Sequence, residues 1–459
     1  MHSRSLSMHT AGKTPSTLLA LGLATALSVA AGGAQADELY IRAGKMLDVD
    51  QGRVLSDQWI QVRDGKVVQV QPYPDGALEQ QAARNARILD WSRYTVLPGL
   101  TDLHTHLVGD IQSSNYAAPL MSSSARDALV GVGNARETLR AGFTTVRDVG
   151  AYRAFTDVAL RDAIAAGTVE GPRMFVAGAY VTVTLGGGEV TGLAPDVQVP
   201  AEMRRGVADS EAQVRQRVRE LLAGGADFIK IISTGAVLAA GTEPGAPEYS
   251  EAEIRAAVQE AALHGSFVTA HAHGAEGIKR AVRAGVRSIE HASYLDDEGI
   301  ALMKQHGTWL VADVYNGDYI EDVGRRDGWS EEILRKNRET TDTQRAGFAK
   351  AVRAGVRIGF GTDSGVYPHG LNARQFSYMV RQGMSPMRAI QSATIEPARL
   401  MRRESEFGSI AAGRSADLIA VAGDPVADIE ILRQVQAVVQ AGRLVCAADA
   451  AVACRQDKR

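Results

Sequence analysis

The sequence alternates between amphipathic helical stretches and short apolar runs, and this alternation restricts the fold more than any other feature. Three helical stretches are each followed by a short apolar run: 211–223 by 228–232, 251–263 by 267–270, and 275–284 by 288–290. Ser250 and Glu253 form a capping-box pattern at the start of one predicted helix. Strands that alternate with helices form parallel sheets, because each crossover places a helix on a sheet face. The pattern therefore predicts an α/β protein.

A seven-residue fragment supports this interpretation, because residues 281–287 recur letter for letter at 351–357. Each copy ends a predicted helix, turns through a glycine and enters a strand. Regular repetition of this kind fits a TIM (β/α)8 barrel, in which the active site lies at the carboxyl ends of the strands. A doubly wound open sheet is the alternative. It is disfavoured because no glycine-rich phosphate-binding loop follows the first strand.

Both ends of the chain have a different, β-rich character. Between residues 39 and 70, alternating apolar and polar residues flank the turn Asp64-Gly65, which is a strong hairpin signal. A similar pattern returns between residues 417 and 442. Cys446 and Cys454 follow it, and the sequence leaves open whether they form a disulfide or stay as two thiols.

The first 36 residues resemble a secretory signal rather than part of the fold. Arg4 and Lys13 precede an apolar run at 18–31, and the small-residue pattern Ala-Gln-Ala ends at Ala36. A membrane-spanning helix needs about 20 apolar residues, which is longer than this run. We expect cleavage after about Ala36, a secreted or periplasmic protein, and no membrane attachment in the mature form. A buried N-terminal helix is the alternative.

The charge balance excludes one class of partner. The 459 residues include 50 Lys and Arg and 53 Asp and Glu, for a formal net charge of −3. A nucleic-acid-binding protein needs a basic excess to neutralise phosphates. We therefore expect no nucleic-acid partner.

Side chains that can bind metals recur where predicted strands end. His104 and His106 share one face of a strand because they are two residues apart. The others are Lys230 within 228–232, His271 and His273 after 267–270, His291 after 288–290, and Asp363 after 357–362. Each alone has an ordinary explanation, such as a surface histidine, a snorkelling lysine or a capping carboxylate. Together they favour a site for zinc or a similar divalent ion.

These residues resemble, in the same order, the metal-binding motifs of the amidohydrolase superfamily. The resemblance covers nearly the whole chain after residue 36 and begins with Pro-Gly-Leu-Thr-Asp-Leu-His-Thr-His at 98–106. The segments 270–274 and 288–291 are similar to the branch that contains imidazolonepropionase-related, prolidase-like, carboxypeptidase-like and ochratoxin-hydrolysing enzymes. One departure is visible. That branch often has Gly-Gly-His where this chain has Gly-Gly-Gly-Glu at 186–189, so Glu189 receives no role.

The signal pattern and the resemblance together predict a division of the chain into four parts. They are a signal peptide at 1–36, the first part of a small β-sandwich at 37–97, a (β/α)8 barrel at 98–400, and the second part of the sandwich with a C-terminal tail at 401–459. The two β-rich ends would then join in one domain beside the barrel. A homo-oligomer is also expected from the family.

The resemblance also implies a binuclear zinc centre. In it, His104, His106 and Asp363 hold the more buried ion, and His271 and His291 hold the more exposed one. Lys230, carboxylated on its amine, bridges the two ions and offsets their repulsion. A bridging hydroxide attacks the carbonyl while Asp363 acts as general acid and base.

Two further residues have weaker assignments. His273 is expected either to contact the substrate or the developing oxyanion, or to support a ligand. Asp148 is interpreted as structural or as support for a ligand.

The expected activity is hydrolysis of an amide or peptide bond adjacent to a carboxylate, in a dipeptide, an N-acyl amino acid or an ochratoxin-type amide. The alternatives are a phosphotriesterase- or lactonase-type hydrolase on the same metal pair, and a non-catalytic binding protein on this fold. The lysine argues against deaminase-type chemistry, since enzymes of that kind in this superfamily commonly use one metal.

Overall fold

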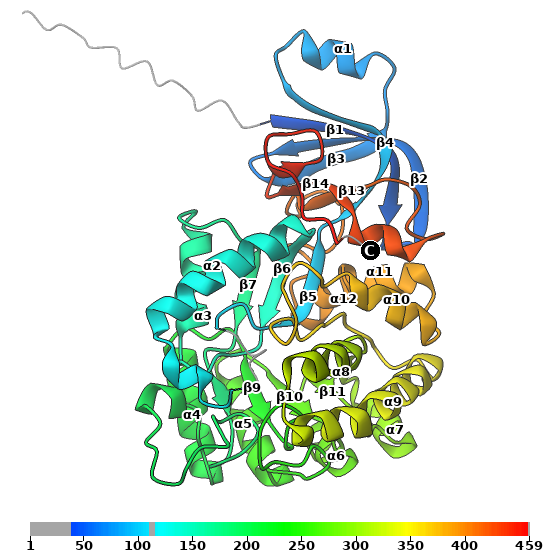
Figure 1. Cartoon of the computed structure of the whole chain (residues 1–459). Helices are drawn as coiled ribbons and strands as arrows, with labels where there is room; N and C mark the ends of the chain where they lie inside the picture. The colour runs from blue at the N-terminus through cyan, green and yellow to red at the C-terminus, as the bar shows by residue number, and fades with distance from the viewer. Residues whose placement is uncertain (1–37, 110–114, 458–459) are drawn as a thin grey trace, which may run out of the picture. The chain divides into compact units, whose positions relative to one another are not determined.

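The computed structural model describes residues 38–109 and 115–457. The predicted signal peptide at 1–36 lies outside the described residues, so its cleavage and the export of the protein stay predictions. Within the described ranges, no helix is both long enough and apolar enough to cross a membrane. A β-rich region made from both ends of the described chain accompanies an α/β region made from its middle (Figure 1).

The β-rich region is a seven-stranded sheet in the order β15-β14-β13-β4-β1-β2-β3. Its strands are β1 (Glu38–Asp48), β2 (Arg53–Arg63), β3 (Lys66–Pro72), β4 (Arg87–Pro98), β13 (Leu418–Val421), β14 (Val435–Gln440) and β15 (Arg443–Ala447). The two ends of the chain meet where β4 pairs antiparallel with β13, with Pro98 opposite Leu418. Cys446 of β15 forms a disulfide with Cys454, which answers the question that the sequence left open.

The predicted hairpin is confirmed between β2 and β3. Arg63 pairs with Lys66, so Asp64 and Gly65 form a two-residue turn. Both residues have positive φ, 50° and 75°, as a tight turn of this type requires. The strands pair as one sheet, and a sandwich of two packed sheets stays a prediction, as do the four domain boundaries.

The α/β region contains two parallel sheets, in the orders β5-β6-β7 and β12-β11-β10-β9-β8. Their strands are β5 (Leu100–Thr105), β6 (Phe143–Asp148), β7 (Arg173–Val176), β8 (Tyr180–Val181), β9 (Ile229–Ile232), β10 (Val268–Ala272), β11 (Ser288–His291) and β12 (Trp309–Val311). Every pairing in both sheets is parallel. The predicted α/β class is therefore confirmed.

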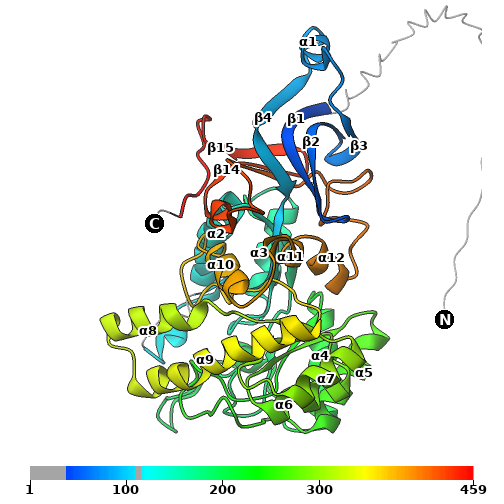
Figure 2. The same cartoon turned by 90° about the vertical axis from the view of Figure 1, so that its right-hand side faces the viewer.

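Helices alternate with these strands, and the long α9 extends beside α8 (Figure 2). They are α2 (Ser124–Arg140), α3 (Thr156–Ala165), α4 (Glu211–Ala223), α5 (Glu251–Leu263), α6 (Ala275–Ala284), α7 (Asp297–His306), α8 (Asn316–Asp327), α9 (Glu331–Ala354), α10 (Arg374–Arg381), α11 (Pro386–Ser392) and α12 (Ile395–Leu400). The short α1 (Ala77–Ala82) precedes β4, and 3-10 turns lie at η1 (Ala118–Met121), η2 (Ala201–Arg204) and η3 (Ile429–Arg433). The predicted helices 211–223, 251–263 and 275–284 coincide with α4, α5 and α6, and the capping box at Ser250 is present.

The segment 357–364 lies between the two parallel sheets. The Gly359 amide donates to the Leu310 carbonyl on β12 at 2.9 Å, and the Asp363 amide donates to the His104 carbonyl on β5 at 2.8 Å. One segment therefore bonds to an edge strand of each sheet. A closed eight-stranded barrel requires such a contact, and the barrel stays a prediction.

A buried ion pair crosses the interior of the α/β region. Arg147 on β6 and Glu290 on β11 lie 2.7 Å apart, and neither side chain is exposed. Arg147 also donates to the Leu103 carbonyl at 2.6 Å and to Ser288 Oγ at 3.0 Å. Buried charges are tolerated where pairing and hydrogen bonds replace water. This pair therefore ties β5, β6 and β11 together.

We expect Arg147→Met to lower the free energy of unfolding by about 3–5 kcal/mol, because it leaves the Glu290 carboxylate buried without its cation. Urea denaturation followed by circular dichroism measures the change. Arg326→Met is the control, since Arg326 pairs with its neighbour Asp327 and its side chain is 70% exposed. A surface pair contributes little. Equal stability of the two variants would contradict the structural role of the buried pair.

Candidate metal centre

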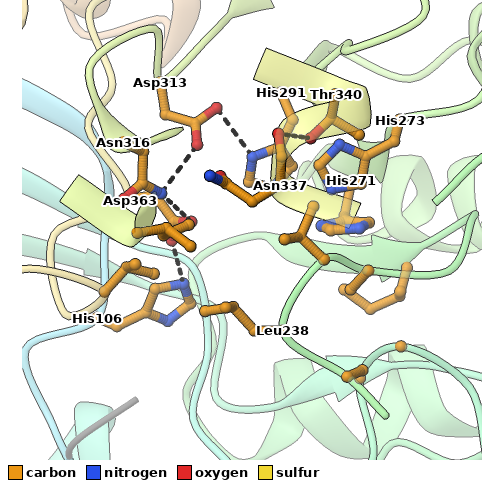
Figure 3. A pocket seen from close by; sticks show the side chains of 18 of the residues that line it. His106, Leu238, His271, His273, His291, Asp313, Asn316, Asn337, Thr340 and Asp363 are labelled. Carbon is orange, nitrogen blue, oxygen red and sulfur yellow. Dashed lines mark hydrogen bonds and ion pairs between the residues drawn. The ribbon is translucent and has the colours of Figure 1, made fainter. Parts of the chain in front are cut away.

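All the sequence-predicted site residues line one cavity at the carboxyl ends of the parallel strands. They are His104, His106, Lys230, His271, His273, His291 and Asp363. Figure 3 shows the labelled histidines and Asp363 directed toward a shared space. The β strands explain this placement, because consecutive parallel strands end at the same edge of a sheet. Their assignment as ligands stays a prediction.

His104 and His106 both direct one ring nitrogen at Asp363. The Nε2 atoms of His104 and His106 lie 3.4 and 3.2 Å from Asp363 Oδ1. The other ring nitrogen of each is already in contact with an oxygen. His104 Nδ1 lies 2.9 Å from Glu290 Oε2, and His106 Nδ1 lies 3.0 Å from the Gly150 carbonyl. The two Nε2 atoms are therefore the ones available to a metal.

The other three histidines form a second group, in which the potential ligand atoms lie within 4.8 Å of one another. Each ring has one nitrogen next to an oxygen: Asp313 Oδ1 at 3.0 Å for His291, the Gly235 carbonyl at 3.3 Å for His271, and Ser293 Oγ at 2.8 Å for His273. His291 also belongs to a group with His104 and Asp363, whose potential ligand atoms meet the same distance limit. It therefore connects the two groups.

These contacts fit a divalent metal centre. A metal-binding histidine usually bonds a carboxylate or carbonyl through one ring nitrogen and the metal through the other. Imidazole and carboxylate ligands suit zinc. His273 shares a group with His271 and His291, so its position is compatible with a ligand as well as with the predicted substrate contact.

Burial keeps most of these imidazoles neutral, which is the metal-binding form. It lowers the pKa of His104, His271 and His273 well below the usual range, and neighbouring cationic groups lower it further. Burial has the largest single effect on the pKa of His291 and lowers it, but the Asp313 and Asp363 carboxylates together raise the pKa overall.

Lys230 is buried on β9, with 1% of its surface exposed, so it does not snorkel to solvent. Burial lowers the pKa of its amine to about 8, against the opposing effect of the Glu290 and Asp363 carboxylates. A fraction of the Lys230 amine is therefore unprotonated near neutral pH, and the unprotonated amine is the form that reacts with carbon dioxide.

The polar residues that hold the histidines were not predicted from the sequence. Asp313 follows β12, so the rule that identified the other strand-end residues would also have found it. Gln344 donates to Asp313 Oδ1 at 2.8 Å, and Asn316 donates to Asp313 Oδ2 at 3.1 Å and Asp363 Oδ2 at 3.2 Å. Glu290 has no local signal, because its partner His104 is 186 residues away in the sequence.

Asp148 and Glu189 differ in position, because Glu189 lines the cavity and Asp148 is not among the lining residues. Asp148 is buried and accepts a hydrogen bond from the Leu107 amide at 2.6 Å, which agrees with a structural role. Glu189 lines the cavity and forms an ion pair with Arg204 at 2.8 Å. In the segment that departs from the family pattern, Glu189 is therefore an acid whose charge is balanced by a neighbouring arginine.

Comparison with known proteins gives a consistent result. The model of the amidohydrolase family matches residues 95–445. The ochratoxinase of Aspergillus niger is 32% identical over 361 residues, which cover 75% of this chain and 73% of the relative. Among solved structures, a Xaa-Pro dipeptidase with bound methionine in its active site has 38% identity and a TM-score of 0.81, and covers 89% of this chain and 99% of its own. A prolidase complexed with N-methylphosphonate-L-proline has 30% identity, a TM-score of 0.81 and the same coverage.

We expect Asp313→Asn to weaken zinc binding by about 10–100-fold, because it removes the negative charge that orients and polarises His291. Competition with a chromophoric chelator measures the affinity. Asp297→Asn is the matched control, since Asp297 pairs with Lys350 and its side chain is 83% exposed. An unchanged zinc affinity in Asp313→Asn would exclude His291 as a ligand oriented by this carboxylate.

Proposed function

Because the chain belongs to the amidohydrolase family, we propose that it hydrolyses an amide or peptide bond adjacent to a carboxylate, using two divalent metal ions. The chain is a hydrolase that acts on amide bonds. The observation that carries the finer proposal is the cavity in which neutral imidazoles, Asp363 and the buried Lys230 amine converge.

His104, His106 and Asp363 would hold one ion, and His271 and His291 would hold the second. The ions, zinc in this proposal, would acidify a water molecule and polarise the scissile carbonyl. Lys230 would lie between them as a carbamate. To form it, the unprotonated amine nitrogen adds to the carbon of carbon dioxide and a proton leaves, which turns a buried cation into an anionic ligand.

Asp363 would take the proton from the attacking water and return it to the leaving amine. Its position supports this role, because Asn316 donates to Asp363 Oδ2 at 3.2 Å while Asp363 Oδ1 faces His104 and His106. Asp363 has a φ of 57°, a left-handed conformation that costs a non-glycine residue on the order of 1–3 kcal/mol. The bond from its amide to the His104 carbonyl helps to hold this conformation.

The proposed substrates are dipeptides, N-acyl amino acids and ochratoxin-type amides. This proposal is supported by the similarity of the chain to a Xaa-Pro dipeptidase, a prolidase and an ochratoxinase. His273 would contact the substrate or the developing negative charge on the carbonyl oxygen.

Four further proposals accompany this activity. The segment 357–364 would complete a closed eight-stranded barrel, and the seven-stranded sheet would belong to a small β-sandwich. Residues 1–36 would direct export and be removed. The mature protein would act as a homo-oligomer, without nucleic-acid or membrane partners.

We expect Lys230→Ala to lose at least one zinc ion per chain and nearly all activity, because the variant lacks the anionic bridge between two cations. Metal analysis by mass spectrometry and an amidase assay measure both effects. Added formate, acetate or propionate should restore part of the rate by occupying the space of the missing side chain.

The matched control is Lys336→Met, since Lys336 is a second lysine with no exposed side-chain surface. It should keep both ions even if it melts at a lower temperature. A Lys230→Ala variant that keeps full activity and both ions would refute the bridged centre.

The substrate proposal predicts that blocking the carboxylate next to the scissile bond slows hydrolysis. The comparison uses N-acetyl-alanine and its carboxamide, with kcat/KM measured on the zinc-loaded protein. If the blocked compound reacts equally fast while a phosphotriester or a lactone reacts faster, the alternative hydrolase replaces the proposal. A protein that binds no metal after zinc supplementation would support the non-catalytic binding protein instead.

A further inference from the structure

One wall of the cavity is apolar. Tyr116, Leu238, Ile320 and Val366 line it and belong to a single cluster of contacting apolar side chains. The buried side chains of Trp329 and Ile333 complete the cluster. Figure 3 shows Leu238 reaching from its loop toward the part of the cavity that contains His106. We call the four lining residues the apolar wall.

The loop that carries Leu238 is fixed to α9 at two points. Lys336 Nζ donates to the Ala239 carbonyl at 2.9 Å, and the Gly241 amide donates to Glu332 Oε1 at 2.8 Å. Lys336 and Glu332 form an ion pair at 2.6 Å, in which the lysine side chain has no exposed surface. Leu238 is therefore held in place before any substrate binds.

The ring of Tyr116 is also held on two sides. Its hydroxyl lies 2.6 Å from Ser330 Oγ at the start of α9. The backbone of Gly192 packs against the ring, and a Cβ added at this glycine would lie 2.9 Å from a ring carbon. A glycine at this position thus leaves room for the aromatic ring, which completes a preformed apolar surface.

The charges in the cavity point to the same kind of ligand. Within the described ranges, Lys230 is the one lysine or arginine that lines the cavity, and the proposed function assigns it to the metals. Glu189 is already paired with Arg204. The cavity therefore offers a ligand more binding free energy from apolar contact with this wall than from an ion pair.

We propose that the apolar wall is a substrate subsite that selects amides with a bulky aliphatic or aromatic group beside the scissile bond. The inference rests on the proposed amide hydrolysis and adds the chemical class of the substrate side chain. Contact with the wall removes the apolar group from water, and the fixed loop avoids the cost of ordering the subsite during binding.

Binding tests the subsite separately from catalysis. Isothermal titration of the zinc-loaded protein would compare N-benzylacetamide with N-methylacetamide. We expect tighter binding of the benzyl compound, and Leu238→Ala should weaken that binding by about 10-fold with little change for the methyl compound. Leu263→Ala is the matched control, because Leu263 ends α5 with 78% of its surface exposed.

Kinetics test the same subsite with matched substrates. The pairs are Phe-Pro with Gly-Pro, and N-acetyl-phenylalanine with N-acetyl-glycine, so the ring is placed on either side of the bond. We expect a higher kcat/KM for the phenylalanine member of at least one pair. Leu238→Trp should fill the subsite and reverse that preference while metal content stays unchanged.

The two measurements distinguish the possible failures. Equal binding of the benzyl and methyl compounds, or a benzyl preference unaffected by Leu238→Ala and Leu238→Trp, would overturn the subsite even in an active enzyme. A Leu238-dependent benzyl preference in a protein that hydrolyses no amide would support the subsite and overturn the proposed hydrolysis.

Discussion

The geometry of the candidate metal centre depends on the buried ion pair between Arg147 and Glu290. A carboxylate with no exposed surface needs several donors, and Glu290 receives them from Arg147, Ser288 and Thr269. These three donors all contact Glu290 Oε1, and Glu290 Oε2 lies 2.9 Å from His104 Nδ1. The side chain that stabilises the core thus also directs His104 Nε2 toward Asp363. The Glu290 carboxylate therefore contributes both to the stability of the fold and to the orientation of the His104 ring.

The electrostatics of the cavity follow from the same burial. Imidazoles in a dry interior lose their protons, as the lowered pKa of His104 and His271 indicates. His291 differs because Asp313 raises its pKa, and a bound dication would replace the proton that the carboxylate favours there. Burial also lowers the pKa of Lys230 to about 8. Burial therefore favours neutral imidazoles and an unprotonated amine in the cavity, whereas a lysine at a solvent-exposed surface would be a cation.

Local pattern was sufficient to predict the residues on strands but not the contacts between strands. His104 and His106 follow from alternation along β5, and α4, α5 and α6 follow from periodicity and caps. Asp313 fits the same strand-end rule, but the strand before it, β12, is only three residues long and gives a weak sequence signal. Arg147 and Glu290 could not be found that way, because they are 143 residues apart and their pairing appears only when β6 and β11 face one interior. The placement of His273 beside His271 and His291 likewise needs three dimensions.

The cavity has two faces, and they come from different parts of the fold. One carries the proposed metal ligands, and the other carries the proposed substrate subsite. The metal-binding face comes from strand ends, where hydrogen bonds between neighbouring strands restrict each position. The apolar wall comes from loops and from α8, and its position depends on contacts with α9 such as Lys336 to Ala239. A change at Leu238 alters the shape of the wall without touching a ligand or the Arg147–Glu290 pair. If the proposed subsite selects the substrate, substrate preference can vary on this fold while the proposed metal ligands stay the same, because no buried charge has to move.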